Sequence, residues 1–211
     1  MDESLALRWD MISFVKELEE RHKYMLGGNF TWIKAIAENP TQRDILNGLK
    51  IIGNKKVDLI VAFGGGSAID LAKGISTFHG SGYDIEEITD NIKQRIYLKN
   101  TEFIDIIAVP STAGTGSEIT QWATVWDENS EGKYSIDSIN LKPKLALIVP
   151  ELTLTLPDTL TLATGLDAMS HAIEAYWSKH TTPIVQDLAY RAVELIVKNL
   201  RRAIDNPEDM K

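Results

Sequence analysis

Two side chains that bind divalent metals, Asp167 and His171, stand four residues apart in the segment Leu160–Ser178. The segment is helical in composition, and at 3.6 residues per turn this spacing puts both side chains on one helix face, where they can reach one ion. The pair is half a metal site. Spacing alone does not distinguish it from an ordinary i,i+4 pair on a solvated or core-facing helix. The choice between a metal site and an ordinary pair therefore depends on the motifs upstream.

A run of three glycines and a serine, Gly64–Ser67, follows an apolar run and precedes a helical segment. Backbone amides and the helix N-terminus converge there, which predicts an anion site, and glycines leave room for a pyrophosphate. We expect Ser67 to cap the helix and Asp70 to lie in its first turn. The alternative is a tight turn that binds nothing, and the usual G-x-G-x-x-G fingerprint is absent.

A second loop, Pro110–Glu118, carries four hydroxyl side chains and two glycines directly after another apolar run. In open α/β folds nucleotides bind at the carboxyl ends of the strands, where both loops are expected. A Gly/Ser/Thr cluster is by itself more typical of a flexible surface loop. Because both loops follow buried strands, a ligand shared by the two is the better explanation.

The elements around these motifs alternate between strand and helix patterns. Continuous apolar runs predict strands that are buried on both faces of a parallel sheet, and 3.6-residue periodicity predicts helices. We expect strands at 58–63, 104–109 and 145–149, a short strand over 30–37, helices at 5–23, 42–54 and 67–78, and a β-hairpin formed by 121–127 and 133–137.

From Pro150 onward the pattern becomes wholly helical. Asp158 or Thr159 is expected to cap the helix that carries the Asp/His pair, and Pro183 fits the first turn of a second helix that runs to about Asp205. Its apolar side chains recur on one face: Val185, Leu188, Ala192, Leu195 and Ile196. The fold class is therefore α/β, with a parallel-sheet nucleotide-binding domain over 1–150 and the start of an all-helical, metal-binding domain over 151–211.

Composition excludes several classes of protein. The chain has 211 residues, 44% hydrophobic and 25% charged, and no apolar run of 18 residues, so no membrane span is predicted. Its net charge of −8 argues against nucleic acid as a partner. The absence of cysteine excludes thiolate chemistry and fits a cytoplasmic protein.

Four motifs together resemble the iron-containing (group III) alcohol dehydrogenase family. They read GGGSAIDLAKGI (64–75), VPSTAGTGSE (109–118), ELTLTLP (151–157) and ATGLDAMSHAIEAY (163–176). Their order and spacing match the family over roughly 39–206. The resemblance implies the dehydroquinate synthase-like fold, with an α/β domain that binds NAD or NADP, a helical domain that binds a divalent metal, and an active site between them.

The resemblance also assigns roles. Asp167 and His171 match the first two metal ligands, with Fe(II) expected and Zn(II) or Mn(II) equally suited by the ligand chemistry. The positions that match cofactor contacts are Asn39, Gly65, Gly66, Ser67, Ser111, Thr112, Thr115, Thr124, Lys133 and Leu154.

Two departures from the family pattern matter. Family members add two later histidines to the metal site, and they begin with a strand that has no counterpart here. The other histidines of this chain, His22, His79 and His180, are expected on the surface or in loops. The sequence therefore resembles the middle portion of a dehydrogenase subunit.

The implied reaction is metal-assisted hydride transfer between the nicotinamide and a small alcohol or aldehyde, in an enzyme that is a homodimer at full length. The segment Gln121–Trp126 is similar to the branch that reduces phosphonoacetaldehyde, although tryptophans that fill the packing face of the hairpin would read the same. Two alternatives stay open: a non-catalytic NAD(P)-binding remnant, and a metal-independent relative with lyase-type chemistry.

Overall fold

The structure is a computed structural model that describes residues 30–34, 38–128 and 132–209, together with Asp10, Ser13, Lys16, Glu17 and Glu20. Within these ranges the chain forms two compact units. The first contains the residues up to Pro110 and Ser117–Leu147, and the second contains Ser111–Gly116 and Ile148–Lys211. The helix expected over 5–23 falls almost wholly outside the described residues. None of the described helices has the length and apolar character needed to cross a bilayer.

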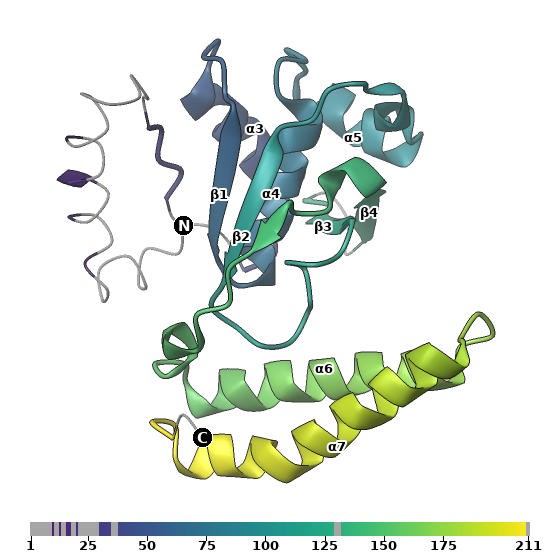
Figure 1. The fold of residues 1–211 in the computed structure, drawn as a ribbon. Coiled ribbons are helices and arrows are strands. Elements are labelled where there is room, and N and C mark those ends of the chain that lie inside the picture. The colour runs from purple at the N-terminus through teal and green to yellow at the C-terminus, as the bar shows by residue number, and fades with distance from the viewer. Residues whose placement is uncertain are drawn as a thin grey trace. The chain divides into compact units, whose positions relative to one another are not determined.

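A parallel three-stranded sheet forms the centre of the first unit (Figure 1). Strand β1 (Leu59–Gly64) pairs with β2 (Asp105–Pro110), which pairs with β5 (Leu145–Ala146). The predicted parallel sheet is confirmed. The strand expected over 145–149 is only two residues long, and residues 30–34 have no regular structure where a short strand was predicted.

One face of the sheet is covered by helix α4 (Gly66–Phe78). Ala62 of β1 and Ile106 and Ala108 of β2 pack with Ile69 and Ala72 of that helix in one apolar cluster. The other face differs from the prediction, because Leu59 is 46% exposed and Val61 is 59% exposed. In the described part of the chain β1 is thus buried on one face only, since no second layer of described residues covers those two side chains.

Two further helices, α3 (Gln42–Ile52) and α5 (Ile85–Lys93), complete the first unit with the short 3₁₀ turns η1 (Ile96–Lys99) and η2 (Ile139–Leu141). Helix α3 confirms its predicted ends. It starts at a capping box between Thr41 and Asp44, and it stops at Gly53, whose φ of 61° suits glycine. Helix α5, capped by Asp84, was not predicted from the sequence.

The predicted β-hairpin is confirmed as β3 (Trp122–Trp126) and β4 (Lys133–Asp137). Ala123, Val125 and Ile136 are its buried residues and join the main apolar core of the unit. Trp122 lies on the opposite face and is 53% exposed. The interpretation that the tryptophans fill the packing face is therefore wrong, because residues of a strand alternate between its faces and Ala123 and Val125 occupy the packing side.

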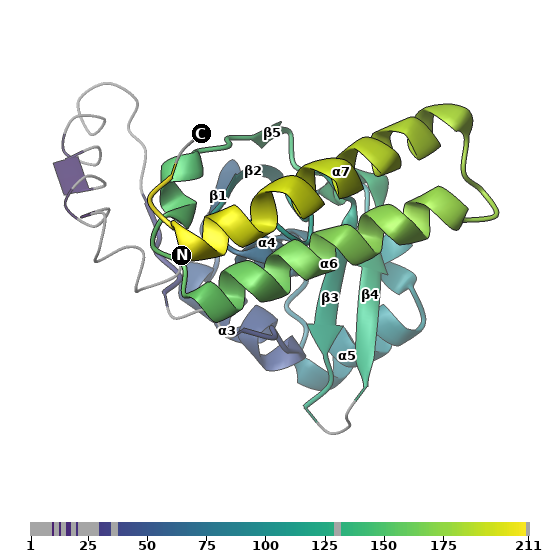
Figure 2. The same cartoon turned by 90° about the horizontal axis from the view of Figure 1, so that it is seen from below.

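The second unit contains the turn η3 (Pro150–Thr153) and two long helices, α6 (Asp158–Trp177) and α7 (Pro183–Asp205), which lie side by side in Figures 1 and 2. Pro183 occupies the first turn of α7 as predicted, after the N-cap Thr182. The N-cap of α6 is Pro157, so neither Asp158 nor Thr159 caps it. On α7 only Ala189 is fully buried, and the predicted apolar side chains Leu188 and Leu195 are exposed.

Candidate cofactor and metal sites

The first glycine loop joins β1 to the N-terminus of α4. Gly64 has a φ of 147°, a conformation that glycine adopts without the strain of a Cβ atom. Gly65 is the N-cap, and among the described residues no side-chain hydrogen bond caps the helix. The first-turn amides and the positive end of the helix dipole are therefore groups that can bind an anion.

Ser67 and Asp70 have roles that differ from the predicted ones. Ser67 lies inside the helix, and its hydroxyl donates to the carbonyl of Glu38, which lies 29 residues earlier and next to Asn39. Asp70 lies beyond the first turn. Neither side chain caps the helix, because each has a partner from a distant segment.

The segment around Asn39 is fixed to the hairpin. The amide of Trp126 donates to the carbonyl of Pro40 at 2.9 Å, and Thr41 forms an isolated parallel bridge with Trp126. Lys133, paired with Trp126 across the hairpin, places its Nζ 5.9 Å from the centre of that ring. The structure thus brings Asn39, Ser67 and Lys133 onto connected segments of one unit.

Thr124 is connected to the glycine loop through α4. Its backbone amide donates to Oδ2 of Asp70 at 2.9 Å, and Asp70 lies one turn after Ser67 on the helix. The Gly64–Ser67 loop, Asn39, Thr124 and Lys133 therefore all belong to the first unit, around the beginning of α4. Sequence reasoning placed these residues in one cofactor site without knowing which contacts connect them.

A residue that sequence reasoning missed, Lys73, makes the most extensive buried polar contacts of α4. Its side chain is fully buried, and Nζ donates to the carbonyls of Ser117 at 2.8 Å and Trp122 at 2.7 Å. A longer contact of 3.4 Å reaches the hydroxyl of Thr120. The available signal was a lysine in a helix whose other residues are mostly apolar, because a buried ammonium requires partners.

Burial shifts the pKa values of both charged residues of α4. Burial lowers the pKa of Lys73 to about 8, against the opposing charges of Asp70 and Glu118. Burial also raises the pKa of Asp70, against the Thr124 amide, the Lys73 charge and the Ser117 side chain. At neutral pH most of Lys73 is still an ammonium ion, which can donate to three acceptors at once.

The second loop leaves the same edge of the sheet, because Gly64 and Pro110 are paired at the ends of β1 and β2. Its central part, Ser111–Gly116, belongs to the second unit. A Cβ atom on Gly114 would lie 2.9 Å from Cβ of Thr164 and 3.0 Å from its carbonyl oxygen. Only glycine lets the loop approach α6 this closely. The contact is at Thr164, three residues before Asp167. Ser111 is buried, whereas Thr115 is exposed.

Asp167 and His171, the predicted metal ligands, both lie on α6. Oδ2 of Asp167 lies 3.9 Å from Nδ1 of His171, and both side chains are partly exposed. In the described part of the chain no group of three or more His, Cys, Asp or Glu side chains could hold a metal. A carboxylate and an imidazole fit Fe(II) or Zn(II), but they supply only part of a coordination shell.

The remaining predicted residues lie elsewhere. Leu154 is half-buried at the end of η3. His79 lies at the end of α4, with Nε2 3.2 Å from the carbonyl of Lys55, and His180 is exposed in the turn between α6 and α7, so both fit the prediction of loop or surface histidines. His22 lies outside the described residues.

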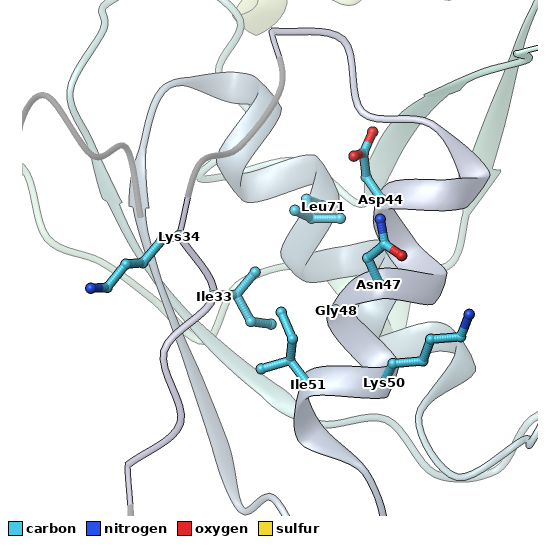
Figure 3. A pocket seen from close by; sticks show the side chains of 8 residues that line it. All are labelled: Ile33, Lys34, Asp44, Asn47, Gly48, Lys50, Ile51 and Leu71. Carbon is cyan, nitrogen blue, oxygen red and sulfur yellow. The ribbon is translucent and has the colours of Figure 1, made fainter.

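A cavity of about 440 Å³ opens beside α3 in the first unit (Figure 3). Its lining residues are Ile33, Lys34, Asp44, Asn47, Gly48, Lys50, Ile51 and Leu71. None of them is a predicted site residue, and the carboxylate of Asp44 already accepts from Thr41. This cavity therefore does not include the predicted cofactor residues.

Family comparison agrees with the geometry. The profile described as "Iron-containing alcohol dehydrogenase" matches residues 10–150, and "Fe-containing alcohol dehydrogenase family, C-terminal" matches residues 161–211. The chain belongs to the iron-containing alcohol dehydrogenase family. A relative from Schizosaccharomyces pombe, "Alcohol dehydrogenase 4", is 38% identical over 177 residues, which are 82% of this chain and 40% of that protein. The chain thus spans less than half the length of this relative.

Solved structures of the family share the fold. An iron-containing alcohol dehydrogenase from Thermotoga maritima matches 98% of this chain and 54% of its own, with a TM-score of 0.82 and 28% identity. A sulfoacetaldehyde reductase from Bifidobacterium kashiwanohense, solved in complex with NAD⁺, matches 93% of this chain and 52% of its own, with a TM-score of 0.77 and 30% identity. The predicted family and fold class are confirmed.

Proposed function

We propose that the protein is a metal-dependent oxidoreductase that transfers a hydride between NAD(H) or NADP(H) and a small alcohol or aldehyde. The observation that supports this most directly is that the segments carrying Asn39 and Thr124 are hydrogen-bonded to α4 close to the Gly64–Ser67 loop. The carbonyl of Glu38 accepts from Ser67, and the amide of Thr124 donates to Asp70. The relatives support the same assignment, since one is named an alcohol dehydrogenase and another is solved with NAD⁺. We propose 1–150 as the cofactor domain and 151–211 as the beginning of the metal-binding domain.

In the first unit the proposed cofactor contacts divide by chemistry. Gly65, Gly66 and Ser67 hold the pyrophosphate through backbone amides, which suits a chain of net charge −8, because it needs no excess of basic side chains. Asn39 contacts the adenosine half. Thr124 and Lys133 contact the ribose and nicotinamide side, where the Lys133 ammonium also offsets phosphate charge.

In the second unit we propose that Ser111, Thr112, Thr115 and Leu154 line the cofactor cleft. The hydroxyl groups orient the dinucleotide, and Leu154 excludes water from the nicotinamide side. The packing of Gly114 on α6 supports this role, since it holds the loop against the helix that carries the proposed metal ligands.

Asp167 and His171 are the proposed metal ligands, with Fe(II) expected and Zn(II) possible on ligand chemistry. When bound, such a metal supplies Lewis-acid polarisation of the carbonyl or alcohol oxygen. The two side chains contribute one carboxylate oxygen and one neutral imidazole nitrogen from one face of α6. The homodimer implied by the family resemblance completes the proposal.

Titration of NADH and NADPH fluorescence tests the cofactor site. Gly65 has a φ of −75°, so a valine there is not strained in φ, and it acts by filling the space that the pyrophosphate needs. We expect Gly65→Val to weaken binding at least about tenfold. Thr101→Val, an exposed position outside every helix and strand, is the control and should bind as the wild type does. Unchanged binding by a folded Gly65→Val variant would remove the assignment.

Elemental analysis tests the metal site separately. We expect His171→Ala to hold less Zn(II) or Fe(II) than the wild type after equilibration with the same concentration of free metal. NADH affinity should stay within a few-fold, because the metal does not hold the pyrophosphate. His180→Ala, nine residues later in a turn, is the matched control. Equal metal content in all three proteins would show that the Asp167/His171 pair is structural.

A further inference from the structure

We propose that Asp70 and Lys73 are positioning residues that hold the segment Ser117–Thr124 against α4, so that Thr124 reaches the cofactor bound by the glycine loop. The inference rests on the cofactor site proposed above and adds two residues to it. Neither residue need touch the dinucleotide. Each acts through backbone atoms of the segment that leads into β3.

Lys73 fixes the beginning of this segment. Its fully buried Nζ donates to the carbonyls of Ser117 and Trp122 at 2.8 and 2.7 Å. One ammonium thus joins two points that are five residues apart in the sequence. Without it, two carbonyl groups would lose a charge-assisted bond in a buried place, and the segment would shift to recover partners.

Asp70 fixes the end of the segment. It lies one helical turn before Lys73, and its Oδ2 accepts from the Thr124 amide at 2.9 Å. This carboxylate therefore bonds the strand that carries the proposed ribose-side contact. The proposed pyrophosphate loop lies at the start of the same helix. One rigid element, α4, therefore positions both halves of the proposed dinucleotide site.

The hairpin also has stabilising contacts other than the bonds to Lys73 and Asp70. Ala123, Val125 and Ile136 are almost fully buried in the main core, and five residue pairs join β3 to β4. We therefore expect the loss of Lys73 to displace Thr124 relative to α4 more than it unfolds the hairpin. This separates a positioning role from a purely structural one.

The chain contains no cysteine, which permits a chemical rescue. Lys73→Cys removes the ammonium, and alkylation of the unfolded variant with 2-bromoethylamine followed by refolding restores an amine of nearly the same length. Lys56→Cys, treated in the same way, is the control, because its lysine side chain is 88% exposed. The readouts are NADH affinity and the urea midpoint followed by tryptophan fluorescence.

We expect Lys73→Cys to bind NADH at least about tenfold more weakly, the size of effect seen when outer-shell partners are removed, and alkylation to restore affinity to within about twofold. A folded Lys73→Cys protein with wild-type affinity, or a variant whose affinity does not recover on alkylation, would overturn the proposal.

A second pair of variants keeps the test decisive if Lys73→Cys does not fold. Asp70→Asn retains an oxygen that can accept from the Thr124 amide, whereas Asp70→Ala does not. We expect Asn to bind NADH nearly as the wild type does and Ala to bind it more weakly; equal affinities would overturn the inference. If the wild type itself fails to bind either dinucleotide, the proposed function falls as well, which distinguishes the two failures.

Discussion

At the scale of single residues, the pKa of Lys73 in α4 shows how burial and neighbouring carboxylates oppose each other. The Nζ of Lys73 has three oxygen acceptors, yet burial lowers its pKa to about 8 from an ordinary 10.5. Between these two pH values the unfolded chain binds more protons at this position than the folded chain. The contribution of Lys73 to the free energy of unfolding therefore increases as pH rises from about 8 to 10.5.

This linkage gives a measurable difference between wild type and Lys73→Met. Below pH 8 the two differ by a constant amount, and above it the wild type should gain relative to the variant by up to about 1.4 kcal/mol per pH unit. Urea unfolding at several pH values measures the difference. Lys56→Met, at an exposed position, should show no such gain. A pH-independent difference for Lys73→Met would contradict the shifted pKa.

The same residues show what the sequence could predict. Gly64–Ser67, Asp167 and His171 could be proposed as site residues because glycine runs and i,i+4 pairs are local patterns with a local chemical meaning. Lys73 was missed because two of its acceptors are backbone carbonyls 44 and 49 residues away, which no side-chain pattern encodes. Ser67 was assigned to the wrong role because its hydroxyl donates to the distant carbonyl of Glu38 and does not cap the helix.

At the scale of elements, helix periodicity and apolar runs predicted α3, α4, α6, α7 and the hairpin. The predictions that failed concern what covers an element. The apolar run of β1 predicted burial on both faces, but Leu59 and Val61 are exposed, because burial depends on a neighbouring layer that periodicity does not specify. The length of β5 and the presence of α5 were not predicted for the same reason, because short elements depend on tertiary contacts that periodicity does not specify.

The contact of the second loop with α6 leads to a prediction at this scale. A methyl group on Gly114 would meet the backbone of α6 at Thr164, which cannot rotate away. We expect Gly114→Ala to lower the free energy of unfolding by about 1–3 kcal/mol and to weaken NADH binding, because the loop carries Ser111, Thr112 and Thr115.

Gly165→Ala is the matched control for that experiment. Its methyl group would meet the side chain of Leu200 on α7, whose terminal carbons can move. It should cost stability without a comparable loss of NADH affinity, as measured by urea unfolding and fluorescence titration. If both variants bind NADH as the wild type does, the loop does not contribute to the cofactor site.

At the scale of the whole molecule, the outer face of α7 is strongly apolar. Ile184 is 73% exposed, Leu188 is 67% exposed, and Leu195 lies two turns further along the same face. Exposed apolar stripes of this kind promote self-association. We expect Leu188→Lys to shift the sedimentation profile of the chain toward monomer at a given concentration.

The control for this prediction is Asp187→Lys, which adds positive charge at the neighbouring exposed position and removes no apolar side chain. An equal shift in both variants would attribute the effect to charge instead of the apolar face. An unchanged profile in Leu188→Lys would show that this stripe is not a contact surface between copies.

The division of the chain into two units limits where the gene can be divided or recombined. The chain passes from one unit to the other at three places, after Pro110, after Gly116 and after Leu147. A gene fragment that starts at Ile148 would encode α6 without the loop that packs on it at Gly114, and a fragment that ends at Leu147 would carry that loop without its helix. Recombination at this junction would therefore separate partners, so the two units are expected to be exchanged in evolution as a single block.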